Sequence, residues 1–238
     1  MELLELTALA LAPVVFLFTY VYLSDKYERE PLIYLVITFF LGVATALPVV
    51  YIGGYLQQIT GLSPVHDSNL ELFLYTFFIV AMTEEGMKFL VLRFYNYPHE
   101  EFDEPYDGIM YGVAGSLGFA AIENLLYVFE AEGDGFEIGI LRMFTAVPAH
   151  AMFGVLMGFF VGKAKFLKDG KGALGTIMLG LFSAMFFHGV YDFLLYQEST
   201  YLTLFAFIAL AVGIILAKIA MHTHAEDSPH KFKGPWNS

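Results

Sequence analysis

The chain is predicted to fold as an all-α, polytopic membrane bundle of about seven transmembrane helices, because 58% of its 238 residues are hydrophobic and only 15% are charged. Apolar runs of about twenty residues recur along it, each long enough to cross a hydrocarbon core of about 30 Å. Backbone groups in lipid must bond internally, and the runs are too evenly apolar for barrel strands, so we interpret them as helices. The predicted spans are Leu3–Leu23, Leu32–Gly53, Leu70–Arg93, Gly108–Phe129, Gly139–Gly162, Gly172–Tyr196 and Tyr201–Met221.

The first span is interpreted as an uncleaved anchor. Ala10-Leu11-Ala12 matches a signal-peptidase site, but Glu2 and Glu5 replace the basic residues of a signal peptide and the apolar run continues past the match. The second span is a plain apolar run, whereas the third carries a group of charged residues at its centre. Of the first three spans, only the third is therefore expected to contribute to a functional site.

The fourth and fifth spans have glycine at intervals of three or four residues. Such spacing leaves one helix face without side chains and predicts close packing. The residues are Gly108, Gly112, Gly115, Gly154, Gly158 and Gly162. All connections are short, so we expect residues 1–221 to form one bundle that contains the site. The polar tail, residues 222–238, is predicted to be disordered.

Basic residues beside the spans predict the orientation. Most lie after the first, third, fifth and seventh spans, whereas Arg142 alone lies at an end of the opposite side. The positive-inside rule then places the N-terminus outside and the C-terminus in the cytoplasm, which requires an odd number of spans. We expect a multi-pass protein of a prokaryotic cytoplasmic membrane.

The overall charge and the absence of cysteine exclude several classes. The net charge of −12 argues against binding to nucleic acid, which needs a basic surface. With no cysteine in the chain, there are no disulfides, thiolate metal ligands or cysteine nucleophiles. Any metal would be bound by oxygen and imidazole nitrogen.

Ionisable side chains occur inside four of the predicted spans, where they are costly and usually functional. They are Glu84, Glu85, Lys88, Glu123, His150, His188 and Asp192, with Asn124 beside Glu123. At 1.5 Å per residue these groups lie about 10 to 15 Å from the nearer helix end. We therefore expect them at similar depth in the bundle.

The Glu84-Glu85-x-x-Lys88 group places an ammonium within reach of either carboxylate. One carboxylate can be held ionised by Lys88 while the other faces a cavity, because adjacent helix residues point about 100° apart. A buried salt bridge that only fixes packing would leave one carboxylate without a partner. We favour a catalytic role for the pair.

His188 and Asp192 lie one turn apart, so the carboxylate can orient the imidazole. His150 follows Pro148, which can open the helix towards a cavity. Glu123 could be a ligand, a proton relay or a partner of Arg142, and Asn124 could bond across helices.

Two histidines with several carboxylates form a plausible open zinc site, with three protein ligands and a water. Composition alone favours hydrolysis no more than ion transport. The residues leave both classes open.

The order of motifs resembles the PrsW family of intramembrane proteases, relatives of the CAAX-prenyl and bacteriocin-processing proteases. The matching motifs are Glu84-Glu85-x-x-Lys88, Phe119-x-x-x-Glu123-Asn124, an isolated His150 and His188-x-x-x-Asp192. The resemblance implies cleavage of a single-span or membrane-anchored protein, such as site-1 cleavage of an anti-sigma factor. It covers about half of the chain, from the third to the sixth span.

Two positions differ from the wider superfamily, which has His at the position of Glu123 and commonly Asn at that of Asp192. We therefore favour Zn²⁺ held by His150, His188 and either Glu85 or Glu123, with Glu84 as the base that deprotonates water. In this hypothesis Asp192 orients His188, and Lys88 tunes the ionisation of the Glu pair. Asn124 is counted with Glu84, Glu85, Lys88 and Asp192 among the catalytic residues.

Three alternatives remain open. The superfamily's proposed mechanism is metal-free and depends on glutamate. A seven-helix zinc hydrolase of lipid amides would share the topology, and a proton or ion transporter would also place charges at mid-depth.

Overall fold

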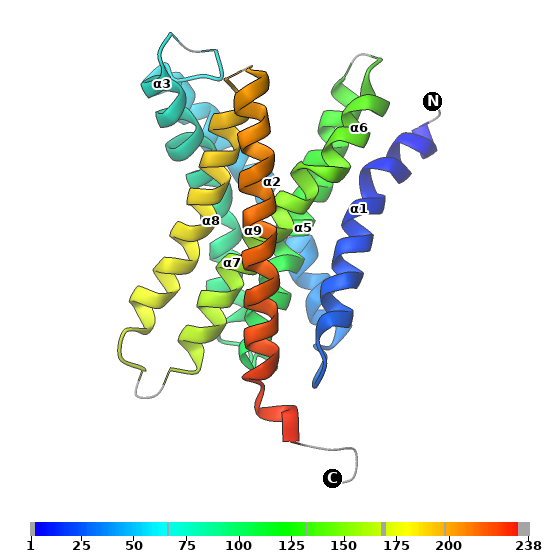
Figure 1. Ribbon diagram of the computed structural model, residues 1–238, viewed down its shortest axis with the longest axis vertical. Helices are drawn as coiled ribbons and strands as arrows, with labels where there is room; N and C mark the ends of the chain where they lie inside the picture. The colour runs from blue at the N-terminus through cyan, green and yellow to red at the C-terminus, as the bar shows by residue number, and fades with distance from the viewer. Residues whose placement is uncertain (1–2, 66, 132, 168–169, 198, 233–238) are drawn as a thin grey trace.

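The computed structural model describes residues 3–65, 67–131, 133–167, 170–197 and 199–232, and within these ranges the chain is helical without any strand. The long helices form one elongated bundle (Figure 1). They are α1 (Leu3–Ser24), α2 (Leu32–Thr60), α5 (Pro105–Glu130), α7 (Ala146–Lys165), α8 (Ala173–Leu195) and α9 (Thr200–Glu226). The predicted all-α membrane bundle is confirmed.

Six stretches in the described part of the chain are long and apolar enough to cross a membrane. They are α1, α2, α5, α8, α9 and the stretch Gly135–Lys165, which combines α6 (Gly135–Phe144) and α7. The protein is therefore a multi-pass membrane protein. The count of seven spans and the orientation of the termini stay predictions.

The predicted third span lies within a continuous helical stretch, residues 69–96, whose hydrogen-bonding pattern changes along its length. It consists of α3 (Asn69–Leu74), the π-helix η1 (Tyr75–Ala81), α4 (Met82–Leu90) and the π-helix η2 (Val91–Asn96). The Ser68 hydroxyl caps its start by accepting a bond of 3.2 Å from the backbone N–H of Glu71. π-Helical turns are rare and often lie at functional sites, and here they flank the Glu pair on both sides.

The predicted fifth span is bent, because α6 ends at Phe144 and α7 begins at Ala146. Thr145 between them leaves the helical conformation, with φ −124° and ψ −78°. Pro148 lies in the first turn of α7, where its missing N–H breaks no helical hydrogen bond. The break sets the direction in which α7 presents His150.

Helices α5 and α7 pack backbone against backbone at the centre, as the glycine spacing predicts. A Cβ on Gly108 would lie 2.4 Å from the carbonyl oxygen of Gly158, and one on Gly112 would lie 2.5 Å from that of Gly154. Gly115 instead faces α2, where Gly42 approaches its carbonyl oxygen. α5 is thus held between α2 and α7, and it carries Glu123 into the middle of the bundle.

The C-terminal end of the bundle is formed by the α1–α2 connection, the segment before α5 and the end of the chain (Figure 1). α9 continues past the predicted bundle end at Met221 to Glu226, and the 3₁₀-helix η4 (Pro229–Phe232) follows. The remainder of the predicted disordered tail, residues 233–238, lies outside the described residues. The opposite end holds α3, α6 and the start of α1.

Candidate active site

Lys88 lies at the centre of the charged cluster. Its Nζ donates to Glu85 Oε1 at 2.8 Å and to Glu84 Oε2 at 3.3 Å, and all three residues are buried. The ammonium also lies 4.1 Å from the centroid of the Phe119 ring. The predicted contact between Lys88 and both carboxylates is therefore present, and it lies in an environment that excludes water.

His150 links this cluster to α5. Its Nδ1 lies 3.1 Å from Lys88 Nζ and its Nε2 lies 2.9 Å from Glu123 Oε2. An ammonium can only donate and a carboxylate can only accept, so Nδ1 must accept and Nε2 must carry the hydrogen. The contacts therefore select one tautomer of the ring.

His188 faces carboxylates at both ring nitrogens. Nδ1 lies 2.9 Å from Glu85 Oε1, while Nε2 lies 3.3 Å from Asp192 Oδ2 and 4.0 Å from Glu84 Oε2. The ring stacks on Phe153 with centroids 4.8 Å apart and planes 12° apart. Asp192 therefore contacts His188 as its spacing predicts, and Glu85 holds the ring from the other side.

Glu123 and Asn124 have different positions. Arg142 Nη2 donates to Glu123 Oε2 at 2.6 Å, and Arg142 Nε donates to Asn124 Oδ1 at 2.7 Å. Asn124 also donates to the carbonyl oxygen of Ala10 at 2.8 Å and is fully buried. Glu123 thus reaches the cluster, whereas Asn124 orients Arg142 and connects α5 to α1.

A cavity of about 620 Å³ brings together side chains from four helical stretches that carry the predicted site. Among the residues predicted for the site, those that line it are Glu84, Glu123, His150, His188 and Asp192. Glu85 and Lys88 lie behind this wall and support it. The cavity also reaches Gln57 near the end of α2 and Tyr196 at the end of α8, so it extends towards the end of the bundle opposite the C-terminus.

Further polar groups in the cavity wall were not predicted from the sequence. They include Tyr75, Tyr127, Tyr191 and Tyr196, together with Arg142, for which the sequence suggested only a contact with Glu123. For Tyr191 a signal was available, because it follows His188 by three residues and therefore shares its helix face. The other three tyrosines lie near helix ends, where apolar periodicity carries no information about a cavity.

The donors present fit a metal ion in their chemistry. Among the described residues, Glu84, Glu85 and His150 offer ligand atoms that all lie within 4.8 Å of one another, and Glu85 Oε2 is buried without a hydrogen-bond partner. Carboxylate oxygen and imidazole nitrogen suit Zn²⁺. Lys88 contacts all three of these residues, so the ammonium and a metal ion would share the same donors.

The observed group overlaps the predicted ligands in part. Glu85 and His150 belong to both sets, and Glu84 is added. His188 and Glu123 contact members of the group at 2.9 Å from either side. The roles assigned to individual ligands stay predictions.

Comparison with known proteins gives a consistent result. The family model described as PrsW family intramembrane metalloprotease matches residues 30–219. Protease PrsW of Geobacillus kaustophilus is 41% identical over 194 residues, which cover 80% of each chain. Protease PrsW of Bacillus subtilis is 38% identical over 192 residues, covering 81% of this chain and 83% of the relative.

A third relative, Protease PrsW of Clostridioides difficile, is 32% identical over 214 residues, covering 90% of this chain and 87% of the relative. No solved structure matches the chain significantly. The family match spans most of the chain and includes every helix that lines the cavity. The chain therefore belongs to the PrsW family of intramembrane metalloproteases.

Proposed function

We propose that this membrane peptidase hydrolyses a peptide bond of a single-span or membrane-anchored protein in a prokaryotic cytoplasmic membrane. The observation that carries the proposal is the convergence of Glu84, Glu123, His150 and His188 on one cavity. Ionisable groups at membrane depth are retained where chemistry needs them. Site-1 cleavage of an anti-sigma factor is the substrate class that the family resemblance suggests.

Glu84 is the proposed general base. Its carboxylate lines the cavity, and Lys88 holds it at 3.3 Å from behind. A carboxylate in this position can accept a proton from a water molecule in the cavity and pass it to the leaving amine. Glu85 lies behind the wall, where its Oε1 contacts Lys88 at 2.8 Å and His188 at 2.9 Å.

His188 is the proposed group that binds the substrate carbonyl. Glu85 and Asp192 hold the ring from both sides, and Phe153 covers one face. A donor fixed in this way in the cavity wall can stabilise negative charge that develops on a carbonyl oxygen.

We propose Zn²⁺ as the metal of this site, with Glu85 and His150 as ligands, so that Glu84 stays the base and His188 the donor to the substrate carbonyl. When bound, zinc supplies Lewis-acid polarisation and lowers the pKa of a bound water. Glu123 then holds the far side of the His150 ring at 2.9 Å, and Arg142 holds the Glu123 carboxylate at 2.6 Å. Such contacts outside the ligand set orient the imidazole.

The cavity has a route for a substrate that lies in lipid. Val49, Val50 and Gly54 of α2 form part of its wall, and Val50 is 65% exposed on the outside of the bundle. A Cβ on Gly54 would meet nothing within 4 Å, so the backbone is open there. An extended peptide from a transmembrane segment could therefore approach along α2.

The proposal is tested by mapping new protein N-termini in membranes of cells that express the wild type or Glu84→Gln. We expect new N-termini inside or beside transmembrane segments of single-span proteins with the wild type only. Glu100→Gln, a change of an exposed acidic residue in the connection between η2 and α5, is the matched control. Identical N-termini for the wild type and Glu84→Gln would refute the assignment.

A metal-free glutamate mechanism is the second candidate, because the Lys88 ammonium contacts all three residues of the potential metal group. Metal content and cleavage of a membrane-anchored substrate would be measured before and after chelation. We expect activity to fall with the metal and to return on addition of Zn²⁺. Full activity after complete metal removal would support the glutamate mechanism instead.

A further inference from the structure

A second group of carboxylates lies at the C-terminal end of the bundle, and its Asp107 is about 24 Å from Glu123 of the catalytic cluster along α5. Glu28 and Glu30 come from the connection between α1 and α2, and Asp107 comes from the first turn of α5. Each offers a ligand oxygen, and these atoms all lie within 4.8 Å of one another. Three carboxylates from two segments thus meet at one point.

Burial makes this group different from an ordinary acidic surface. Glu30 is 1% exposed and Asp107 is 0% exposed. Glu30 Oε1 and Asp107 Oδ1 are both buried and have no hydrogen-bond partner among the described residues. Ionised carboxylates in this position require a compensating positive charge, because burial without one is strongly unfavourable.

The remaining carboxylate oxygens are fixed by donors. Asp107 Oδ2 accepts the backbone N–H groups of Asp103 at 2.8 Å and Glu104 at 2.7 Å, and Glu30 Oε2 accepts the Tyr111 hydroxyl. Each side chain is therefore held in place by one oxygen, and the two carboxyl groups interact with each other, so they need either a shared proton or a cation between them. These carboxylate oxygens are therefore held in position to coordinate a positively charged ion.

The ammonium of Lys165, which interacts electrostatically with Asp107 and Glu30, makes its hydrogen bonds elsewhere. Lys165 Nζ donates to the carbonyl oxygens of Tyr97 at 2.7 Å and His99 at 3.1 Å. It has no ion pair of 4.0 Å or less with Glu30 or Asp107 in the described part of the chain. Lys165 thus interacts electrostatically with Glu30 and Asp107 without forming an ion pair with either.

We propose that Glu28, Glu30 and Asp107 bind an oxygen-preferring divalent cation such as Ca²⁺ or Mg²⁺. All three ligands are carboxylates, which suits these hard ions better than Zn²⁺. The ion connects the α1–α2 segment to the start of α5. Since α5 also carries Glu123, the ion fixes the position of the helix that reaches the active site.

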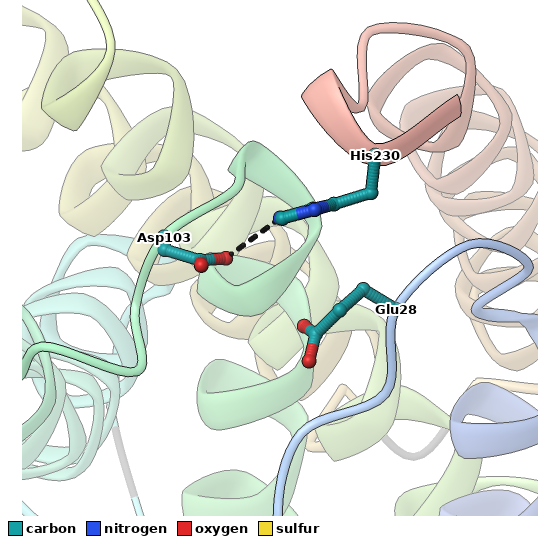
Figure 2. Close-up of side chains that lie close together, drawn as sticks. All are labelled: Glu28, Asp103 and His230. Atoms are coloured by element: carbon teal, nitrogen blue, oxygen red, sulfur yellow. Dashed lines mark hydrogen bonds and ion pairs between the residues drawn. The ribbon is translucent and has the colours of Figure 1, made fainter. Parts of the chain in front are cut away.

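Glu28 also lies close to η4, the 3₁₀-helix that follows α9. Glu28, Asp103 and His230 form a neighbouring group with ligand atoms within 4.8 Å, and His230 Nε2 lies 3.0 Å from Asp103 Oδ1. Figure 2 shows the three side chains converging from three separate segments. Binding of a cation by Glu28 would therefore also order the segment after α9.

The test uses purified full-length protein in detergent at pH 7.5, freed of metal by chelation and buffer exchange. Thermal unfolding is followed with and without 1 mM Ca²⁺ or Mg²⁺. For a site with a dissociation constant of about 0.1 mM we expect the midpoint to rise by about 3 to 6 °C. Glu100→Gln should show the same rise, and so should Glu85→Gln, which changes the catalytic cluster.

Glu30→Gln and Glu28→Gln should lose this rise. Glu28 is only half-buried, so its variant keeps the test valid if Glu30→Gln does not fold. Tb³⁺ added to the wild type should give tyrosine-sensitised emission through Tyr111, and Ca²⁺ should displace it. Absence of a shift in the wild type, or an equal shift in Glu28→Gln, would overturn the proposal and favour a proton shared between Glu30 and Asp107.

Discussion

His150 lies between Lys88 and Glu123, with Nδ1 3.1 Å from the ammonium and Nε2 2.9 Å from the carboxylate. The ring therefore joins the Glu84-Glu85-Lys88 cluster of α4 to the Glu123-Arg142 pair of α5 and α6. Both ring nitrogens are committed, so a change on either side alters the orientation or the tautomer of the ring. This chain of contacts makes residues outside the cavity wall important for activity.

Asn124→Ala tests this dependence without touching the cavity. The change removes the acceptor at 2.7 Å from Arg142 Nε and the bond to Ala10, so Arg142 no longer holds Glu123 in place. We expect cleavage to fall about 10-fold and the free energy of unfolding to fall by about 1 to 3 kcal/mol. The cleavage rate at saturating substrate and the denaturation curve of the same preparation would measure the two effects. An unchanged cleavage rate would contradict the role of Asn124 in positioning Arg142.

Gly158→Ala should disturb the packing of α7 against α5. An added Cβ would lie 2.1 Å from the carbonyl oxygen of Gly108, which is backbone and cannot rotate away. We expect a loss of stability of about 1 to 3 kcal/mol. Gly175→Ala in α8 is the matched control, because its Cβ would meet nothing within 4 Å. If Gly175→Ala lost as much stability as Gly158→Ala, the explanation would be refuted.

Asp25 should make stability depend on pH. Burial, followed by the negative charge of Glu104, raises the pKa of this carboxyl from its ordinary value of 3.8 to about 7. Between these values the folded state binds more protons than the unfolded state, so the free energy of unfolding falls as pH rises from about 4 to about 7. Above this window the loss is complete.

Asp25→Asn should remove that dependence, because an amide carries no charge at any pH in the range. We expect the variant to be more stable than the wild type at pH 8, by about 1 to 3 kcal/mol, and similar to it at pH 4. Unfolding midpoints from pH 4 to 8 would be compared with those of Glu100→Gln. If the unfolding midpoint of Asp25→Asn depended on pH as steeply as that of the wild type, a group other than Asp25 would be responsible for the dependence.

Local spacing was sufficient to predict contacts within one helix. Lys88 meets both Glu84 and Glu85, and Asp192 meets His188, because residues three or four apart share a helix face. The glycine intervals likewise predicted the packing of α5 on α7. The family resemblance predicted the protease, which the comparisons confirm over the transporter and lipid-amide hydrolase alternatives.

Contacts between helices were beyond local reasoning. The approach of His150 to Lys88 joins residues 62 positions apart, and Arg142 reaches Asn124 only because α6 bends away from α7 at Thr145. The π-helical turns around the Glu pair also have no distinct apolar period. These features depend on tertiary packing, which a single sequence pattern does not contain.

The most direct test of the account is the rate at which the protein, reconstituted in lipid vesicles, cleaves a membrane-anchored substrate identified from the N-terminal mapping. Glu84 is predicted to be the base that faces the cavity, so Glu84→Gln should lower the rate at least about 100-fold while the protein remains folded. The exposed Glu100→Gln control should keep the wild-type rate. A folded Glu84→Gln protein that cleaves within about twofold of the wild type would contradict the central claim.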